Sequence, residues 1–341
     1  MKLGRSAIFA VVIGASIASS VDGQSLDLTV HNTGISFGDS KRINGLRFNF
    51  IDKRLEEVNG INVTVWSPKD SVDSVVNGLA LGIPTTGAGD INGIGLGVLG
   101  AGASRNFTGI GFGALGLGAG GDFSGIGIGG LGIGAGGSLR GIGIGGMGAG
   151  AGGPVEGIFI GGLGVGTGAT FSGLGIGGLG IGVGEDATGL LIGGIGVGAG
   201  RVLKGIAIGG IGVGSGEGAE GLLISGFALG TGGTLTGVGI AGFAAGAESL
   251  RGILIAGGAA GGSDLAGLVV APGYFRVDDL GEIRGVSVSA FNHIKGRQNG
   301  LSIGILNYAR RLNGIQLGVL NFAGSNSGWR RWLPFVNWHF D

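Results

Sequence analysis

Residues 125–140 read GIGIGGLGIGAGGSLR, and the next sixteen, residues 141–156, read GIGIGGMGAGAGGPVE. They are two copies of one unit, which recurs from Gly93 to Ala266. In each of the eleven copies in this range, position 1 is Gly, positions 2 and 4 are aliphatic or Phe, and position 9 is Ala or aliphatic. A fixed period of this kind is the sequence signature of a repeat architecture, in which each copy is one structural unit.

The ends of the chain carry the same unit in a less regular form. Asn is frequent at two places there, just before the initial Gly and at position 8. Counting every copy gives 19 starts and therefore 18 complete units. The starts outside the central array are Gly45, Gly60, Gly78, Gly267, Gly285, Gly300, Gly314 and Gly328, the Asn residues before a start are Asn44, Asn59, Asn77, Asn92, Asn299 and Asn313, and those at position 8 are Asn292, Asn307 and Asn321.

Within a unit, apolar residues alternate with Gly, as Ile126 and Ile128 do, and this period of two is typical of a β-strand. The alternation slips between positions 4 and 7, so we expect two short strands separated by a corner. We expect both sets of apolar side chains to face one interior and the Gly residues to form an outward face. Positions 12–16 hold all 13 charged residues of the central array, so this segment should close the unit at the surface.

A unit of this size cannot bury its apolar side chains alone, whereas stacked units bury a continuous core. The sequence therefore predicts an all-β chain that folds as a β-solenoid of about 18 short coils, with the Asn residues at position 8 stacked as an amide ladder. The alternative is an antiparallel meander or an up-and-down β-barrel, because Asn-Gly is a strong hairpin signal and about ten residues match a membrane barrel strand. The uniformity of successive units and the slip within each unit favour the solenoid.

The composition narrows the class of protein. The chain has 341 residues with 90 Gly and 5 Pro, but 43% of its residues are hydrophobic, only 12% are charged and the mean hydropathy is +0.52. These values argue against a disordered chain, and Gly at every second position argues against collagen. The net charge of zero offers no basic field for nucleic acid. With no Cys and three His, we expect no enzyme, no cofactor, and no catalytic, cofactor-binding or metal-binding residues.

The first 23 residues read as a secretory signal peptide. Lys2 and Arg5 give a positive start, and residues 7–13 form an apolar stretch that is followed by small residues. We expect cleavage between Ala18 and Gln24. A membrane anchor is the alternative, but the apolar run is shorter than the roughly 20 residues that a membrane-spanning helix needs.

Both ends of the repeat array should act as caps that cover the open core. The charged run at residues 52–57 is expected to be a solvated part of the N-terminal cap. Three Trp residues near the C-terminus are expected to form a hydrophobic plug over the last coil, with a membrane-interface anchor as the alternative. The predicted segments are residues 1–23 for the signal peptide, 24–92 for the N-terminal cap and divergent repeats, 93–266 for the Gly-rich array, and 267–341 for the C-terminal divergent repeats and Trp-rich cap.

The ends of the chain contain the segments RINGLRFNFIDKRLEEVNGINVTVW (42–66), NGLSIGILNYARRLNGIQLGVLNFA (299–323) and LPFVNWHF (333–340). These segments resemble bacterial surface repeat-containing proteins of the kind found in Leptospira and Bacteroidetes, which carry tandem NGLxIGxxN units and a similar Pro-aromatic-Asn-aromatic tail. The Gly-rich middle departs from that pattern because it lacks both Asn residues. The resemblance implies an exported envelope or surface protein of unassigned biochemical function, and it supplies no site residues.

We therefore expect an exported protein of the cell surface, outer membrane or periplasm, with a structural or interaction role and no catalysis. Its expected contacts are self-association, or contact with the envelope or membrane, through Gly-rich faces. No nucleic acid and no small-molecule substrate are indicated. The alternative function is an outer-membrane β-barrel that acts as a pore or anchor. A third reading is a rod that binds glycan or ice, which would need regular outward rows of Thr or aromatic residues, and the sequence shows none.

Overall fold

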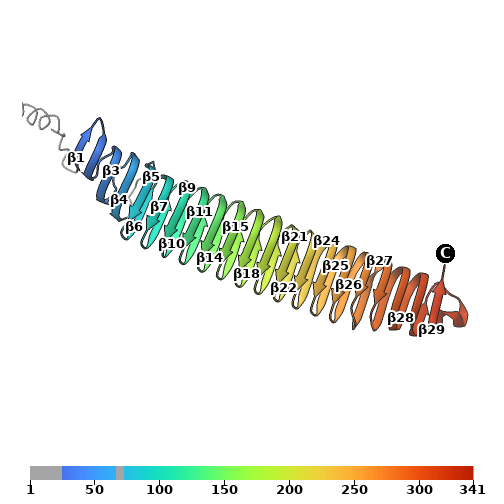
Figure 1. Cartoon of the computed structure of the whole chain (residues 1–341). Coiled ribbons are helices and arrows are strands. Elements are labelled where there is room, and N and C mark those ends of the chain that lie inside the picture. Colours follow the sequence, from blue (N-terminus) through green and yellow to red (C-terminus); the bar gives the residue numbers. More distant parts are fainter. Residues whose placement is uncertain (1–24, 67–72, 341) are drawn as a thin grey trace, which may run out of the picture. The chain divides into compact units, whose positions relative to one another are not determined.

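The computed structural model describes residues 25–66 and 73–340 of the chain. The predicted signal peptide, residues 1–23, lies outside the described residues. The chain divides into two compact units, Met1–Gly162 (unit 1) and Leu163–Asp341 (unit 2), and each is a stack of short coils (Figure 1). The fold is an all-β solenoid with coils of about 16 residues. The one helix of the described residues is the short 3-10 helix η1 (Gly328–Arg331).

Most coils consist of a long strand followed by a short strand. The strands of unit 1 are β1 (Ser25–Val30), β2 (Thr33–Gly38), β3 (Arg42–Ile51), β4 (Glu57–Trp66), β5 (Val75–Gly82), β6 (Thr85–Ala88), β7 (Asp90–Gly97), β8 (Gly100–Ala103), β9 (Phe107–Gly113), β10 (Gly116–Ala119), β11 (Phe123–Gly129), β12 (Gly132–Ala135), β13 (Leu139–Gly145), β14 (Gly148–Ala151) and β15 (Val155–Gly161). The strands of unit 2 are β16 (Gly164–Thr167), β17 (Phe171–Gly177), β18 (Gly180–Val183), β19 (Ala187–Gly193), β20 (Gly196–Ala199), β21 (Val202–Gly209), β22 (Gly212–Ser215), β23 (Gly218–Ser225), β24 (Ala228–Ala241), β25 (Ala244–Ala256), β26 (Ala259–Val270), β27 (Tyr274–Val288), β28 (Phe291–Ala323) and β29 (Trp332–His339). From β24 onward, a short strand continues into the next long strand without a break.

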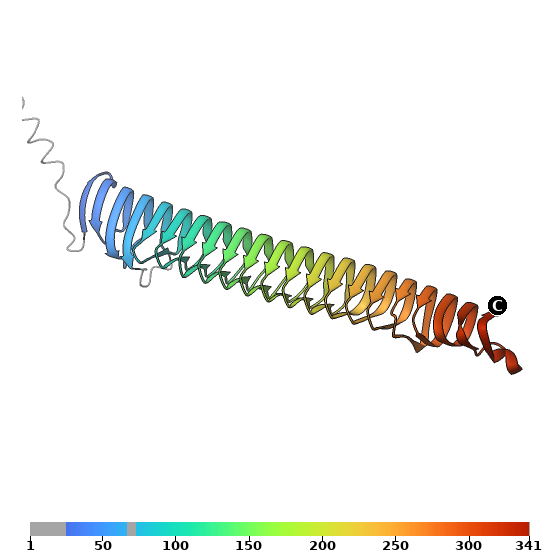
Figure 2. The ribbon, with the colours of Figure 1, turned by 60° about the horizontal axis from the view of Figure 1, so that its bottom comes forward.

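Equivalent strands of successive coils pair in parallel. In unit 1, β11 pairs with β13 and β12 with β14, so that Ile126 lies opposite Ile142 and Ile133 opposite Ala149. In unit 2, β17 pairs with β19 in the same way. Figure 2 shows this side-by-side stacking within each unit from a second direction. The parallel pairing confirms the predicted solenoid and replaces the antiparallel alternative, the meander or barrel, in which neighbouring strands would run in opposite directions.

A glycine with positive φ marks the start of each coil. The eighteen glycines at position 1 from Gly45 to Gly314 have φ between +108° and +145°. Gly34 in β2 has a φ of +150° and lies opposite Gly45, so it is one further coil start that the predicted count omits. The count was also wrong at the other end, because Gly328 begins η1 and not a coil.

One antiparallel strand stands at the N-terminal end of unit 1, and another stands at the C-terminal end of unit 2. In unit 1, β1 pairs antiparallel with β2 through a turn at His31 and Asn32, which both have positive φ. In unit 2, the chain turns back after η1 and β29 pairs antiparallel with β28. The other strand pairs within each unit are parallel among the described residues. Each antiparallel strand therefore ends the parallel ladder on its side.

In the 16-residue coils that start at Gly93 to Gly221, the interior is lined by positions 3, 9, 11 and 15. In the last three coils, positions 8 and 10 are buried in place of position 9. In the coil of β11 and β12, Phe123, Gly127 and Ile133 are buried, whereas Ile126 is 45% exposed and Ile128 is 40% exposed. The prediction that both apolar sets face one interior is therefore wrong for the long strand. The period of two shows which residues share a face of a strand, but not which face lies inside.

The space inside the coil explains this inversion. A Cβ atom on Gly127 would lie 2.2 Å from Cδ1 of Ile133 and 2.8 Å from Cζ of Phe123, so the interior at position 3 is already filled. Positions 15 and 3 share this space, and a larger residue at one is matched by a smaller residue at the other, as close packing requires. The buried pairs are Phe107 with Gly111, Phe123 with Gly127, Leu139 with Gly143 and Val155 with Phe159 in unit 1, and Phe171 with Gly175, Ala187 with Leu191, Leu203 with Ala207, Ala219 with Leu223 and Leu235 with Gly239 in unit 2.

The stacking of coils requires glycine at some positions and not at others. At position 1, a Cβ atom on Gly189 would lie 2.0 Å from the carbonyl oxygen of Gly173 in the preceding coil. At position 6, a Cβ atom on Gly194 would lie 1.9 Å from the carbonyl oxygen of Gly178. At position 10, a Cβ atom on Gly198 would meet nothing within 4 Å. Close backbone contact therefore explains why positions 1 and 6 are glycine. It does not explain the glycine at position 10.

Replacing the glycine at position 1 and the glycine at position 10 of one coil tests whether only the first is required for stacking. We expect Gly189→Ala to lower the free energy of unfolding by about 2 kcal/mol or more, because its φ is +124° and its Cβ would overlap backbone. We expect Gly198→Ala to raise it by about 0.4–1 kcal/mol, because Ala reduces the freedom of the unfolded chain without a clash. Urea unfolding of the two variants measures both, and equal shifts of the midpoint would contradict the distinction.

Candidate functional site

The most regular surface of the molecule is an exposed aliphatic face on the long strands. We define the aliphatic face as positions 2 and 4 of the coils, and none of its side chains is buried. In unit 1 it consists of Leu46, Phe48, Ile61, Val63, Leu79, Leu81, Ile94, Leu96, Ile110, Phe112, Ile126, Ile128, Ile142, Ile144, Ile158 and Ile160. In unit 2 it consists of Leu174, Ile176, Leu190, Ile192, Ile206, Ile208, Leu222, Ile224, Val238, Ile240, Ile253, Ile255, Leu268, Val270, Val286, Val288, Leu301, Ile303, Ile315 and Leu317.

The aliphatic face is more uniform than the interior row beside it. Positions 2 and 4 are apolar in all 18 coils, although they are in contact with solvent. Position 3, which is buried in every coil, varies from Arg47 through Gly127 and Phe159 to Gln316. Burial alone would impose the opposite order, with apolar residues inside and variable residues outside. The uniformity of the exposed rows therefore points to a contact that they make with another surface.

The short strands present a second surface, the glycine face, which we define as positions 8 and 10. In β12 these are Gly132 and Gly134, which are half-buried and point away from the interior, whereas Ile133 between them is buried. Cβ atoms on Gly182 and Gly198 would meet nothing within 4 Å. The predicted outward Gly surface thus exists on the short strands, while on the long strands glycine and aliphatic residues have exchanged places relative to the prediction.

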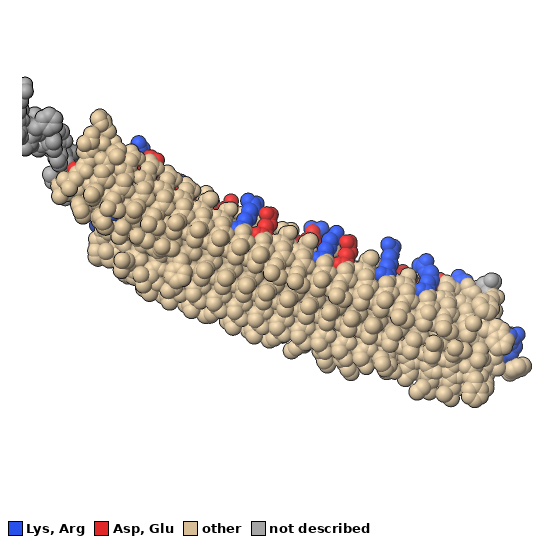
Figure 3. Space-filling view, viewed as in Figure 1, with Lys and Arg blue, Asp and Glu red and all other residues tan. Residues whose placement is uncertain are grey.

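Charged side chains lie along one edge of each unit, and the rest of the face shown in Figure 3 is free of charge apart from a few atoms near the N-terminal and C-terminal ends. Oppositely charged residues at position 16 pair between neighbouring coils, with Arg140 3.3 Å from Glu156 and Lys204 3.5 Å from Glu220. In the same closing segment, the backbone N–H and then the hydroxyl group of Ser138 donate to Asp122 and hold the pKa of this carboxyl below its usual range. Such exposed pairs contribute little to stability. Because the charged residues stand in the closing segments, the aliphatic face itself is uncharged.

The first coils have a polar interior. Arg47 occupies position 3, where it is buried and pairs with the buried Asp52 and with Asp39 at 3.1 Å. Its Nη1 also donates to Oδ1 of Asn62, the position 3 residue of the next coil, at 3.0 Å. The expectation that the whole run at residues 52–57 is solvated is therefore wrong for Asp52 and for Leu55, which is also buried. A buried arginine needs carboxylate partners, and the charged run supplies one of them.

The last coils contain the predicted amide ladder. Nδ2 of Asn292 donates to Oδ1 of Asn307 at 2.6 Å, and Nδ2 of Asn307 donates to Oδ1 of Asn321 at 2.7 Å. The three side chains are buried, which the sequence did not indicate. A second chain of amides continues at the end of unit 2, where Nδ2 of Asn326 donates to Oδ1 of the buried Asn337 at 2.9 Å. These hydrogen bonds fix β29 on the last coil.

The C-terminal aromatic side chains are exposed to solvent and do not enter the interior of the last coil. Trp329 is 78% exposed, Phe335 is 75% exposed and Trp338 is 46% exposed. The prediction that the Trp residues plug the last coil is therefore wrong. Asn326 and Asn337 are buried at this end instead, so that the rings are left in contact with solvent.

A row of aromatic side chains replaces the glycine face in the last coils. Tyr308 stacks on Phe322 with ring centroids 4.7 Å apart, Phe322 lies 4.8 Å from Trp332, and His293 lies 5.4 Å from Tyr308. In the sequence, His293, Tyr308 and Phe322 each follow the position 8 Asn of three successive units, and this shared position 9 was the signal for the row. Tyr308 and Phe322 are stacked, whereas His293 meets Tyr308 edge to face and Trp332 is tilted against Phe322.

His293 sits within this aromatic row. Its Nδ1 lies 2.9 Å from the hydroxyl group of Tyr274. Burial, and then the positive charges of Lys295 and Arg276, lower the pKa of His293 below its ordinary value of 6.5, against a smaller opposing effect of Asp279. The neutral imidazole is therefore the form that fits the folded protein.

The lowered pKa predicts how stability changes with pH. As pH falls below about 6.5, the unfolded chain takes up a proton at His293 before the folded protein does, so the free energy of unfolding decreases until the folded pKa is passed. We expect His293→Phe to remove this part of the pH dependence. Urea unfolding between pH 7.5 and pH 5 measures it, and an unchanged slope in the variant would contradict the assignment.

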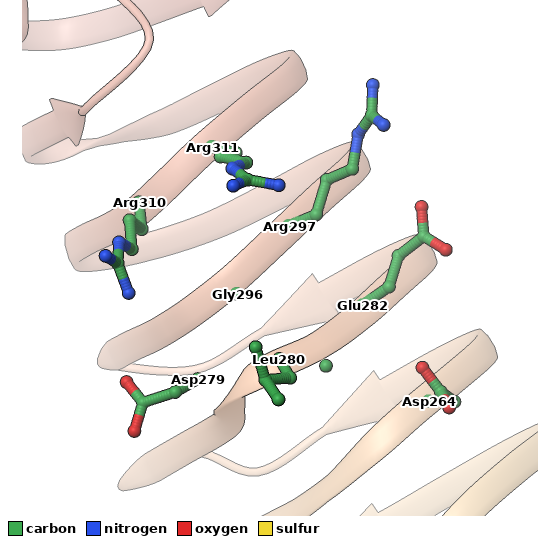
Figure 4. A pocket seen from close by; sticks show the side chains of 9 residues that line it. Asp264, Asp279, Leu280, Glu282, Gly296, Arg297, Arg310 and Arg311 are labelled. Carbon is green, nitrogen blue, oxygen red and sulfur yellow. The ribbon is translucent and has the colours of Figure 1, made fainter.

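A shallow depression of about 370 Å³ lies on the surface of unit 2. Arg310, Arg311 and Arg297 line one part of it, carboxylates line the other, and Leu280 projects between them (Figure 4). Most of the carboxylates have partners, since Glu282 pairs with Arg284 at 3.2 Å and Asp279 with Lys295 at 3.8 Å. Arg310 and Arg311 form no ion pair with a carboxylate of the described residues. The depression is thus an open surface whose three arginines are balanced by three carboxylates, although Arg310 and Arg311 are not paired with any of them.

Neither a metal site, a membrane-spanning helix nor a similar known protein indicates the function of the described part of the chain. In the part of the chain that the structure describes, no three His, Asp or Glu side chains are grouped so as to hold a metal ion. No helix in this part is long and apolar enough to cross a membrane. Comparison of the chain with protein-family models, curated proteins and solved structures finds no match. The surfaces themselves therefore carry the functional argument.

Proposed function

We propose that the protein is an exported, non-catalytic repeat protein of the cell envelope or cell surface, with a structural role that depends on packing of its aliphatic face against that of a second copy. One observation carries the proposal: positions 2 and 4 are apolar in all 18 coils although they are exposed, while buried position 3 varies from Gly to Arg. Export is supported by the signal-like residues 1–23, and the envelope or surface location by the resemblance of the terminal units to bacterial surface repeat proteins.

A second copy is the occupant that best fits the aliphatic face. Its side chains repeat with the coil spacing of about 4.8 Å, and a surface with the same spacing can interdigitate along its whole length. Because both rows are uncharged, two such faces meet without electrostatic repulsion. The glycine face has no side chains to interdigitate, and it therefore offers less apolar area for such packing.

The available area is close to what a stable dimer needs. In unit 2 alone, the aliphatic face covers ten coils. At about 4.8 Å per coil and on the order of 14 Å in width, this strip measures roughly 700 Å². A standard interface buries about 800 Å² on each partner. The eight further coils of unit 1 carry the same rows, so the area does not limit association.

Charged substitutions on the aliphatic face test the proposed packing. We expect the purified wild-type protein to sediment as a dimer or larger assembly, and the double variant Ile206→Lys/Ile253→Lys to sediment as a monomer, because a lysine in the interface loses its hydration. The matched control Thr188→Lys/Thr236→Lys adds the same charge to exposed position 16 of unit 2 and should assemble like the wild type. Sedimentation velocity with circular dichroism as a folding check measures this. A monomeric wild type, or a face variant that assembles normally, would refute the proposal.

Fractionation of cells tests the location. We expect the chain expressed with its native N-terminus to lose that segment between residues 18 and 24, to appear outside the inner membrane, and to be released by alkaline carbonate. Mass spectrometry of the N-terminus and immunoblots of the fractions measure this. A chain that keeps residue 1 and stays in the cytoplasm would show that export is wrong, independently of the result on assembly.

A further inference from the structure

Positive charge is concentrated at the C-terminal end of unit 2. Between Ile283 and Phe340 the chain has seven Lys or Arg residues and no Asp or Glu. Arg310, Arg311 and Arg330 form no ion pair with a carboxylate of the described residues. We define the C-terminal tip as β28, η1 and β29. The seven cationic residues are Arg284, Lys295, Arg297, Arg310, Arg311, Arg330 and Arg331. Arg284 lies in β27, outside the tip, and pairs with Glu282, and Lys295 pairs with Asp279.

Exposed aromatic side chains lie at the same end of unit 2, next to Arg330. The tip carries three of the four Trp residues of the chain. Arg330 lies over the ring of Trp338 at 5.8 Å, so a cation and an indole share one surface. The exposed aromatic residues of η1, β29 and the following residue are Trp329, Trp332, Phe335, Trp338 and Phe340.

The backbone holds these rings outward. β29 is fixed by the buried Asn337, while Phe335 has a φ of +63°, an unfavourable conformation for a bulky residue. The register places Trp338 opposite Ile315 and Val336 opposite Leu317, so the aromatic end continues the aliphatic face. The backbone at the exposed Phe335 is strained, and the large rings around it are in contact with solvent. We infer from this that the rings contact a second surface when the protein acts.

We propose that the C-terminal tip binds the surface of a lipid bilayer that contains anionic lipids. Trp residues prefer the headgroup region, where the ring is partly dehydrated and its N–H still finds a partner. Lys and Arg residues near such a surface are attracted by the negative charge of the lipids. An acidic polysaccharide would attract the arginines, but it offers no apolar layer for Phe335 and Trp329. This proposal doesn't rest on the assembly of the aliphatic face, because its residues lie at one end of unit 2.

Vesicle binding by the whole protein tests the proposal. We expect the protein to co-sediment with vesicles of 70% phosphatidylcholine and 30% phosphatidylglycerol, at least tenfold more strongly than with pure phosphatidylcholine, and binding to weaken in 500 mM NaCl. The variant Arg310→Gln/Arg311→Gln should weaken binding to the anionic vesicles about tenfold. The matched control Arg140→Gln/Arg201→Gln removes two exposed arginines from the closing segments of other coils and should bind like the wild type.

A second measurement separates insertion of the rings from simple charge attraction. In a Trp66→Phe background, every remaining Trp lies in the tip, and we expect its fluorescence to shift to shorter wavelength on binding anionic vesicles. Trp329→Ser/Phe335→Ser should bind at least tenfold more weakly, with an unchanged circular dichroism spectrum. Absence of vesicle binding, equal losses in the arginine variant and its control, or binding of dextran sulfate with no fluorescence shift on vesicles would each overturn the proposal.

Discussion

Every coil depends on the close approach of its position 1 glycine to the carbonyl oxygen of the same glycine one coil earlier. A Cβ atom on Gly125 would lie 1.8 Å from the oxygen of Gly109, and the φ of Gly125 is +141°. No side chain fits both conditions, so the column is glycine in every coil. Because each glycine meets its own equivalent, the register between coils is fixed at one repeat. The parallel ladders on both strands follow from this register.

The packing of the interior follows from the register as well. With each residue beside its equivalent, the residues at positions 15 and 3 share a narrow space, and Phe123 can be present only because position 3 is Gly127. At the ends of the chain, the same position holds Arg47 and Gln316, which are buried and hydrogen-bonded. The interior is therefore apolar in the middle coils and polar in the terminal ones, where β1 and β29 change the strand direction.

The sequence predicts the repeat, the strands, the corner and the parallel solenoid, because the period and its slip are properties of the backbone. It does not predict which side of the long strand is inside. Ile126 and Ile128 are the most apolar residues of their strand, and hydrophobicity alone places them in the core, whereas the core residue Phe123 stands in the polar closing segment. The uniformity of positions 2 and 4 beside the variability of position 3 was the signal that could have located the aliphatic face. The exposed C-terminal Trp residues were misplaced for a related reason, since the sequence does not show that Asn326 and Asn337 occupy the interior there.

The repetition of the coil has a consequence for the length of each unit. Because every coil offers the same ladder and the same position 1 contact to the next, one 16-residue unit can be removed or duplicated and the coils on either side can still pair in register. Each such change alters the span by about 4.8 Å and adds or removes one pair of aliphatic side chains. The length of the stack of coils and the area of the aliphatic face are therefore coupled. Both can change in equal steps while the ends of the chain stay the same.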